Sequence, residues 1–302
     1  MVKSLVLENI SVGFKLPQGV FYAVDDVSLN LHGGNFTAII GESGCGKSVL
    51  GQAILNILPS GVVKKGRVLY NGEQVKKILS AFGIIPQNPS ESLNPVRKIG
   101  KQMQDILAVH NITDGDNSYK KQCLRLFGLQ EAERVLAAYP HELSGGMLQR
   151  VLCAMAVSSK PEWILADEPT KGLDEQVGAV VRKNLLTIKQ DLRLSMLIIT
   201  HDIALAQEVC DDVLVMYAGQ VLEHNADIWH KPLHPYTKGF LQALPKNGLQ
   251  VIRGKAPVPG ESFTGCKFAA RCPYCTTRCK EEMPAMQQVG NAEVRCFLYA
   301  EG

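Results

Sequence analysis

The sequence has almost no excess of charge of either sign and no long hydrophobic run. Its 32 Lys and Arg residues against 29 Asp and Glu give a net charge of +3, which is too small to indicate nucleic acid or a strongly acidic partner. No stretch reaches the roughly 18 apolar residues of a membrane-spanning helix, and Glu8 and Asn9 interrupt what would be a signal-peptide core. No internal repeat is visible either. We therefore expect a soluble, cytosolic protein with one copy of its main folding unit.

Cysteine, by contrast, is plentiful. Five of the nine cysteines fall between residues 266 and 296, and the other four lie singly along the chain. In a reducing compartment such a group of thiols is more typical of metal ligands than of disulfides. The 302 residues, set against about 150 per domain, indicate two domains. The composition, 46% hydrophobic and 20% charged, is that of an ordinary globular protein.

Strand-like and helix-like patterns alternate over the first 240 residues or so, which predicts an α/β fold. A helix is expected from Lys47, where apolar residues recur at helical spacing. Between residues 98 and 158 helical patterns dominate, which indicates a helical insertion, and residues 245–265, rich in proline and glycine, are expected to be an extended linker. Apolar runs predict strands at residues 36–40, 67–70, 82–85, 163–166, 196–200 and 212–217.

A phosphate-binding loop is predicted between the strand at residues 36–40 and the helix that follows. Gly41-Glu-Ser-Gly-Cys-Gly-Lys-Ser48 matches the pattern G-x-x-x-x-G-K-[ST]. The glycines let consecutive backbone N–H groups curl around phosphate oxygens, and the helix N-terminus adds partial positive charge. We expect Lys47 to reach the β- and γ-phosphates and Ser48 to ligate Mg²⁺. The predicted nucleotide contacts here are Gly41, Ser43, Gly44, Cys45, Gly46, Lys47, Ser48 and Val49.

Two acids end a later apolar run. Trp163-Ile-Leu-Ala-Asp-Glu168 is typical of a buried strand that delivers a carboxylate, here Asp167, to Mg²⁺. Glu168 is then placed to polarise an attacking water as a general base. Alone, such a strand end is most often a solvated tip. Together with the phosphate loop, it predicts ATP hydrolysis.

A third motif precedes a helical pattern. In Leu143-Ser-Gly-Gly-Met-Leu-Gln-Arg150, the Ser144 hydroxyl and the Gly145 and Gly146 amides would form a second anion cradle at a helix start. This segment resembles the LSGGQ signature of ATP-binding cassette (ABC) ATPases. The resemblance implies a head-to-tail dimer, in which this cradle contacts the ATP held by the partner's phosphate loop. Met147 departs from the usual glutamine, and Lys171 and Gly172 replace the small residues common before the next motif.

Further positions match the ABC family one by one. Gln87 resembles the Q-loop glutamine, which touches Mg²⁺ and senses the membrane partner. His201 resembles the switch histidine at the γ-phosphate, and Asp174, in Gly172-Leu-Asp174, resembles the D-loop at the dimer interface. Phe14 stands where the family's adenine-stacking aromatic is expected, with Tyr22 as the alternative. The resemblance thus names Glu168, His201, Lys47 and Gln87 as catalytic and Ser48, Gln87 and Asp167 as Mg²⁺ ligands.

The end of the chain resembles a particular branch of the family. Pro232-Leu-His-Pro-Tyr-Thr237, Gly265-Cys-Lys-Phe268 and Arg271-Cys-Pro273 are similar to the C-terminal extension of oligopeptide, dipeptide and nickel importer ATPases. This implies a cassette over residues 1–245 and an extension over 246–302. It also implies a paralogous or identical ATPase partner, two transmembrane permease subunits, an extracytoplasmic solute-binding protein, and a place at the cytoplasmic face of the membrane.

The resemblance also implies a metal centre in the extension. Related extensions carry cysteines matching Cys266, Cys272, Cys279 and Cys296, and some members of the family bind a [4Fe–4S] cluster there, which requires four thiolates. Cys275 is then an extra thiol and the alternative ligand. The spacing alone leaves zinc open, because Cys272-x2-Cys275 is also a familiar zinc pattern.

The function expected is therefore that of the ATP-hydrolysing subunit of an importer for peptides or nickel. Two alternatives remain at this point: a soluble ABC ATPase acting in DNA repair or translation, and a metal- or redox-sensing ATPase. The first is disfavoured because the chain has one cassette and no sustained heptads.

Overall fold

The computed structural model describes residues 4–17, 19–74, 81–112, 116–244, 248, 250–258 and 261–300. The chain folds into two compact units. Unit 1 contains residues 32–36 and the described part of 76–209, and unit 2 contains residues 4–31, the described part of 37–75 and the described part of 210–302. Residues 4–31 and the described part of 210–302, which are far apart in the sequence, therefore belong to the same unit.

Three parallel strands form the sheet of unit 1, in the order β6, β7, β8. They are β6 (Phe82–Ile85), β7 (Trp163–Asp167) and β8 (Ser195–Ile199), and all three were predicted. Nearly every residue of β7 and β8 is buried, as expected for parallel strands covered on both faces. The carboxyl ends of parallel strands lie at one edge of a sheet, so the chain segments that follow β6, β7 and β8 gather there.

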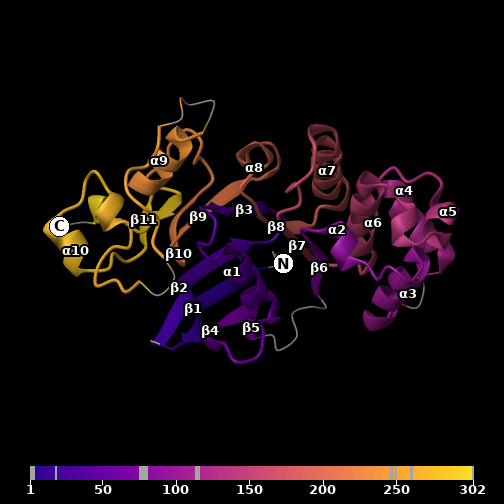
Figure 1. Ribbon diagram of the computed structural model, residues 1–302, viewed down its shortest axis with the longest axis horizontal. Helices are drawn as coiled ribbons and strands as arrows, with labels where there is room; N and C mark the ends of the chain where they lie inside the picture. Colours follow the sequence, from indigo (N-terminus) through magenta and orange to yellow (C-terminus); the bar gives the residue numbers. More distant parts are fainter. Residues whose placement is uncertain are drawn as a thin grey trace. The chain divides into compact units, whose positions relative to one another are not determined.

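Helices make up the rest of unit 1, including the group drawn in magenta in Figure 1. Within the described part of residues 98–158 there is no strand, as predicted. Helix α6 is buried on almost all sides, with Leu148, Val151, Leu152 and Met155 on the predicted core face. The helices are α2 (Pro89–Ser92), α3 (Ile99–Val109), α4 (Asn117–Leu126), α5 (Ala132–Ala137), α6 (Gly145–Ser158), α7 (Glu175–Thr187) and α8 (Ile203–Val209), with a 3₁₀ turn η2 (Pro140–Glu142) and a π turn η3 (Ile188–Leu192).

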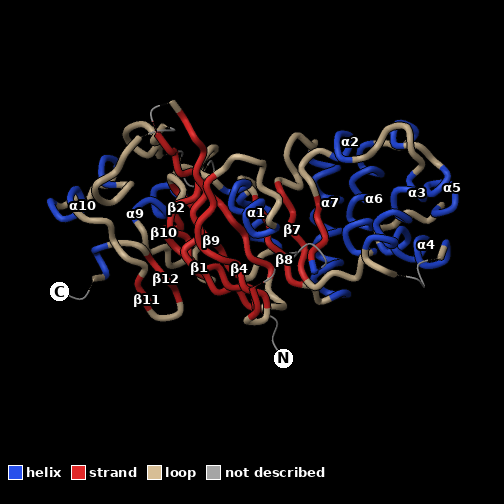
Figure 2. Tube along the Cα trace, turned by 90° about the horizontal axis from the view of Figure 1, so that it is seen from below, coloured by secondary structure: helices blue, strands red, loops and turns tan. Residues whose placement is uncertain are grey.

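Unit 2 contains strands from both ends of the chain. Strand β3 (Phe36–Gly41) pairs in parallel with β9 (Asp212–Tyr217), and both were predicted. The antiparallel strands β10 (Gln220–Asn225), β12 (Ala292–Val294) and β11 (Gln287–Val289) extend this set in that order (Figure 2). The predicted boundary at residue 245 stays a prediction, although β10 and β12 from its two sides pair with each other.

A second, antiparallel sheet of unit 2 has the order β2-β1-β4-β5. The strand predicted at residues 67–70 is the end of β4, whereas β1 and β2 were not predicted. The register of β1 against β4 shifts between Glu8 and Ser11, and this irregularity breaks the simple alternation that identifies a strand. The strands are β1 (Ser4–Leu16), β2 (Gly19–His32), β4 (Val63–Tyr70) and β5 (Glu73–Gln74), and the helical elements are α1 (Lys47–Leu55), α9 (Pro235–Gln242), α10 (Thr277–Glu281), η5 (Ala269–Arg271) and η6 (Phe297–Tyr299).

Of the predicted linker, residues 245–247, 249, 259 and 260 lie outside the described part of the chain, and the other residues form neither helix nor strand. No helix in the described ranges is both long enough and apolar enough to cross a bilayer.

Candidate nucleotide site and cysteine cavity

The phosphate loop joins the end of β3 to the start of α1, as predicted. Gly41 has φ +150° and Gly46, the residue before α1, has φ +104°. A Cβ on Gly41 would lie 2.2 Å from the carbonyl oxygen of Met216, and one on Gly46 would lie 2.1 Å from that of Ala23. Both positions therefore require glycine, for the backbone angle and for the close approach of a neighbouring strand.

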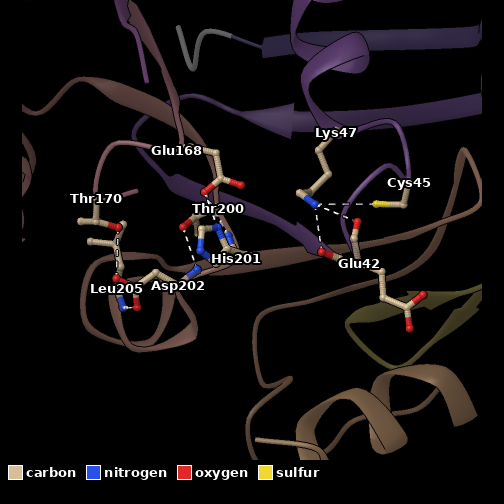
Figure 3. Close-up of polar contacts among 10 residues, drawn as sticks. Glu42, Cys45, Lys47, Glu168, Thr170, Thr200, His201, Asp202 and Leu205 are labelled. Atoms are coloured by element: carbon tan, nitrogen blue, oxygen red, sulfur yellow. Dashed lines mark hydrogen bonds and ion pairs between the residues drawn. The ribbon is translucent and has the colours of Figure 1, made fainter. Parts of the chain in front are cut away.

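Lys47 points into the loop and is held by it (Figure 3). Its ammonium donates hydrogen bonds to the carbonyl oxygens of Gly41 at 2.9 Å and Glu42 at 3.1 Å, and the side chain is buried. These partners are uncharged, so the positive charge is available to a phosphate. The Lys47 ammonium also donates to the sulfur of the buried Cys45 at 3.9 Å, and burial raises the pKa of this thiol. The loop's exposed residues are Ser43, Gly44 and Ser48, and Val49 is half-buried.

The two acids lie at the end of β7 in unit 1. Asp167 is half-buried as the last residue of the strand, and Glu168 follows it with φ +49°, in the left-handed region. The Glu168 backbone N–H donates to the Ile199 carbonyl at 2.8 Å, which fixes this turn to β8. The Glu168 carboxylate is consequently buried at the carboxyl edge of the sheet.

His201 meets Glu168 at this edge. The imidazole Nδ1 lies 2.6 Å from the Glu168 carboxylate, while 56% of the His201 side chain is exposed (Figure 3). With a carboxylate as its neighbour, Nδ1 carries the proton and donates it. The predicted base and the predicted switch histidine are thus brought together, with the imidazole reaching outward from the buried acid.

A small network, which the motifs did not predict, holds His201 in place. Asp202 accepts from the Thr170 hydroxyl at 3.1 Å and from the Leu205 backbone N–H at 3.0 Å, and its own N–H donates to the Thr200 hydroxyl at 2.9 Å. The Thr-His-Asp sequence was the available signal for Thr200 and Asp202. Thr170 lies 32 residues away from Asp202, so no local pattern could reveal it.

The signature segment and the D-loop each cap a helix of unit 1. Ser144 accepts a hydrogen bond from the Met147 N–H at 3.3 Å at the start of α6, as predicted for an N-cap. Asp174 likewise caps α7, accepting from Val177 at 2.8 Å. Ser144 and Gly145 are exposed, and a Cβ on Gly145 would meet nothing within 4 Å. The amides at the start of α6 are therefore accessible to an external anion.

Two further predicted residues lie in other segments of the chain. Gln87 is exposed in the loop after β6, and Phe14 is half-buried in β1. In unit 2, a cavity of about 290 Å³ beside the phosphate loop is lined by Tyr22 together with Gly44 and Lys267. Phe14 does not line it. The structure thus places Tyr22, the alternative aromatic, next to the loop, while the roles of Phe14 and Gln87 stay predictions.

Four of the five clustered cysteines line one cavity of about 190 Å³ in unit 2: Cys266, Cys272, Cys279 and Cys296. Burial, reinforced by the neighbouring thiols, raises the pKa of Cys266 to about 11 and also raises that of Cys272 and Cys296. Cys275 is not in the lining, and its thiol contacts the Thr276 carbonyl at 3.5 Å. Within the described residues, no three His, Cys, Asp or Glu side chains are grouped as ligands of a single metal ion, so a metal in the extension stays a proposal.

Two regions of the chain match known protein families. Residues 24–171 match the family described as ABC transporter, and residues 222–279 match the family described as oligopeptide/dipeptide transporter, C-terminal region. The oligopeptide transport ATP-binding protein OppD of Haemophilus influenzae is 34% identical over 98% of this chain and 98% of its own. The dipeptide transport ATP-binding protein DppD of Escherichia coli is 36% identical over 95% and 94%.

A solved structure supports the fold assignment. The dimeric structure of a bacterial ABC transporter cassette superimposes with a TM-score of 0.60 at 26% identity, covering 72% of this chain and 96% of that one. OppD and DppD match this chain over nearly its whole length. The phosphate loop, the acid pair at the end of β7 and the helix start at Ser144 agree with the same family. The chain belongs to the ABC transporter family, as one of its ATP-binding ATPases.

Proposed function

We propose that this chain is the ATP-hydrolysing subunit of a membrane importer for oligopeptides or dipeptides. The observation that carries the proposal is the match over nearly the full length to oligopeptide and dipeptide transport proteins, including the C-terminal region. Nickel, the other cargo expected from sequence, has no support among these relatives. An ABC ATPase of DNA repair or translation is disfavoured for the same reason, since the similarity to transport proteins extends over the whole chain.

The chemistry proposed is hydrolysis of ATP by a water that Glu168 activates. Support comes from the buried carboxylate and from His201, whose Nδ1–H fixes the orientation of the acid. Lys47 would neutralise the β- and γ-phosphates, and the exposed side of His201 would stabilise charge on the γ-phosphate. Mg²⁺ supplies charge neutralisation to the triphosphate. Its proposed ligands Ser48, Asp167 and Gln87 are all oxygen donors, which Mg²⁺ prefers.

A second ATPase subunit, either a paralogue or another copy of this chain, is proposed as the dimer partner. The exposed start of α6 at Ser144, Gly145 and Gly146 would contact the ATP held by the partner's phosphate loop, because free helix amides attract anions. The similarity to a cassette of known dimeric structure supports this arrangement. Asp174 would lie in the same interface, although its carboxylate already caps α7.

Two permease subunits are proposed to dock on unit 1 beside Gln87. A groove of about 580 Å³ lies among β6, α3 and α6 and includes Ile84, Arg97 and Val109. Ile84 and Val109 are exposed apolar side chains, as is Val96 nearby, and such a patch is typical of a protein interface. The chain would thus lie peripherally at the cytoplasmic face of the membrane. An extracytoplasmic solute-binding protein would supply the peptide to the permeases.

A [4Fe–4S] cluster is proposed for the cysteine cavity. Four thiols line one cavity, and four thiolates are the number that such a cluster requires. When bound, the cluster supplies redox or structural chemistry to the extension. Cys266, Cys272, Cys279 and Cys296 would hold it, and Cys275 would not.

The transport function is tested in proteoliposomes that contain the chain with its permeases and ATPase partner. Peptide-loaded binding protein is expected to stimulate ATP hydrolysis and uptake of labelled peptide, whereas labelled nickel is not taken up. ATP turnover that ignores the binding protein would contradict the proposal. Uptake of nickel without peptide would replace the proposed cargo.

The metal centre is tested separately on chain purified without oxygen. We expect about four iron and four sulfide per chain. The Cys272→Ser variant should lose them, while Cys275→Ser, the matched control, should keep them. Zinc at about one per chain, or equal loss in both variants, would rule out the proposed cluster.

A further inference from the structure

Arg271, in the C-terminal extension, reaches the phosphate loop within unit 2. Its Nη1 lies 3.1 Å from both carboxylate oxygens of Glu42, the second residue of the loop. The two residues are 229 positions apart in the chain, and only 7% of the Arg271 side chain is exposed. Because the ion pair is buried and joins residues far apart in the sequence, it forms only when the chain is folded.

The surroundings of Arg271 suit a guanidinium. Its Nε donates to the Arg253 carbonyl at 3.2 Å, and Nη1 also donates to the Tyr217 hydroxyl at 3.3 Å. The cation lies 5.7 Å from the centre of the Tyr217 ring and 6.0 Å from that of Phe268. Hydrogen bonds in a fixed plane together with aromatic faces favour Arg over Lys.

Glu42 presents a problem that this contact solves. The loop must bind a polyanion, yet it carries a carboxylate of its own, which would repel a triphosphate. The Glu42 backbone N–H donates to the Tyr236 hydroxyl at 3.1 Å, and its carbonyl accepts from Lys47. Figure 3 shows the carboxylate turned away from the Lys47 ammonium. Arg271 therefore both neutralises the carboxylate and holds it on the far side of the loop.

Lys267, a second basic residue of the extension, binds residues next to the phosphate loop. Lys267 Nζ donates to the Ala218 carbonyl at 2.8 Å and pairs with Asp25 at 2.7 Å. The next residue, Gly219, donates its N–H to the Cys45 carbonyl within the loop at 2.9 Å. The extension thus supports the phosphate loop through two separate contacts.

We infer that Arg271 is a positioning residue of the nucleotide site, which lets the phosphate loop bind ATP by neutralising Glu42 and turning its carboxylate away. The inference rests on ATP binding at this loop. It assigns to the extension a direct part in nucleotide affinity, whether or not its cysteines hold a metal.

The test measures equilibrium binding of a non-hydrolysable ATP analogue to the full chain and four variants. Arg271→Ala should weaken binding about tenfold, the scale of one uncompensated charge near a protein surface. Glu42→Gln should bind more tightly than the unaltered chain, because the Arg271 cation is left near the loop without its carboxylate. The double variant Glu42→Gln/Arg271→Ala should bind like the unaltered chain, since neither the carboxylate nor the cation that pairs with it is left. Arg253→Ala, an exposed arginine of the same extension, is the matched control and should bind like the unaltered chain.

The double variant separates positioning from a merely structural role. If Arg271→Ala does not fold but the double variant folds and binds, the inference stands, because the unpaired carboxylate was the cause. Affinity within twofold of the unaltered chain in Arg271→Ala, a double variant that binds as weakly as Arg271→Ala, or failure of both variants to fold would each overturn it. In the assembled transporter, Arg271→Ala should raise KM for ATP and leave kcat unchanged, and Arg271→Lys should restore part of the loss. Failure of the unaltered chain to bind the analogue would contradict the proposed function instead.

Discussion

Glu168 combines two features that are unusual for a glutamate. Its φ of +49° lies in the left-handed region, which is costly for residues other than glycine, and its side chain is buried. The hydrogen bonds to Ile199 and His201 hold it there. A strained and buried carboxylate beside a partly exposed imidazole is typical of a catalytic acid–base pair, for which the surrounding structure maintains an unfavourable conformation.

Glu168→Gln should abolish ATP turnover at this subunit's site. The amide cannot accept a proton from water, and loss of a general base reduces turnover by about 10² to 10⁴. ATP binding should remain, because the phosphate loop is unchanged. The measurement is phosphate release by the assembled transporter, with Glu175→Gln, an exposed acid at the start of α7, as the control. Undiminished phosphate release at this subunit's site would contradict the role of Glu168 as general base.

Gly46→Ala should destabilise the chain and impair ATP binding. The added Cβ would lie 2.1 Å from the Ala23 carbonyl, in addition to the strain of φ +104°. Gly61→Ala is the matched control, since Gly61 has φ +89° with nothing within 4 Å of its Cβ position. Strain alone should cost the control about 1 kcal/mol, and Gly46→Ala should cost clearly more in a denaturant titration. Equal losses in the two variants would show that the close approach to Ala23 is unimportant.

At the scale of single residues, the sequence alone predicted the site residues that lie in short motifs. Lys47, Glu168 and His201 each lie in a short pattern with its own chemistry, and the structure places Glu168 against His201. The sequence alone did not predict the roles of Thr170 and Arg271. Neither has a local signal, because each acts through a partner 32 or 229 positions away, and only the folded chain brings such pairs together.

At the scale of elements, His224 joins three strands of unit 2. Lying in β10, it contacts Asp212 of β9 at 3.1 Å and Glu293 of β12 at 3.2 Å. Burial alone would lower the pKa of His224, but the hydrogen bonds and charges of the two carboxylates outweigh burial and raise it above the ordinary value. The protonated imidazole is therefore favoured by the folded chain.

The stability that His224 contributes should depend on pH in a defined direction. Because its pKa is raised on folding, the contribution is complete below the unfolded value of about 6.5 and is lost as pH rises through the folded value. The difference in Tm between the unaltered chain and His224→Gln should therefore shrink from pH 5.5 to pH 8.5. A difference that is constant or grows with pH would contradict the role of the two carboxylates.

The strands that could be predicted from the sequence are those whose residues are nearly all apolar. Strands β3, β7, β8 and β9 are nearly continuous apolar runs because they are buried on both faces, and β6 is such a run although its Ile84 is exposed. Strand β1 instead alternates between buried and half-exposed residues and changes register at Glu8, so no single period describes it. Strands β11 and β12 have three residues each, too few for any periodicity to appear.

For the whole molecule, removal of residues 246–302 should do more than delete a separate tail. The chain would lose Arg271 and Lys267 beside the phosphate loop, and β10 would lose its partner β12. We expect the shortened chain to bind ATP at least tenfold more weakly, by the same charge argument, and to aggregate more readily through its newly exposed strand edge. The measurements are analogue binding and light scattering on heating.

Full-length chain with serine at Cys266, Cys272, Cys279 and Cys296 is the control for that truncation. It removes any metal centre but retains both cations, so its ATP affinity should stay close to that of the unaltered chain. A truncated chain that binds as tightly as the full chain would contradict the structural role given to the extension.

The distance along the chain between Glu42 and Arg271 sets an order of events during synthesis. At about 5–20 residues per second, roughly 11 to 46 seconds separate the two residues on the ribosome. Throughout that interval the nascent phosphate loop carries its carboxylate without the guanidinium that pairs with it. By the tenfold estimate above, ATP in the cell therefore stabilises the growing chain less through this site until Arg271 is made. The nucleotide reaches its full effect as a folding ligand only when synthesis is nearly complete, so a chain released too soon gains less protection from it.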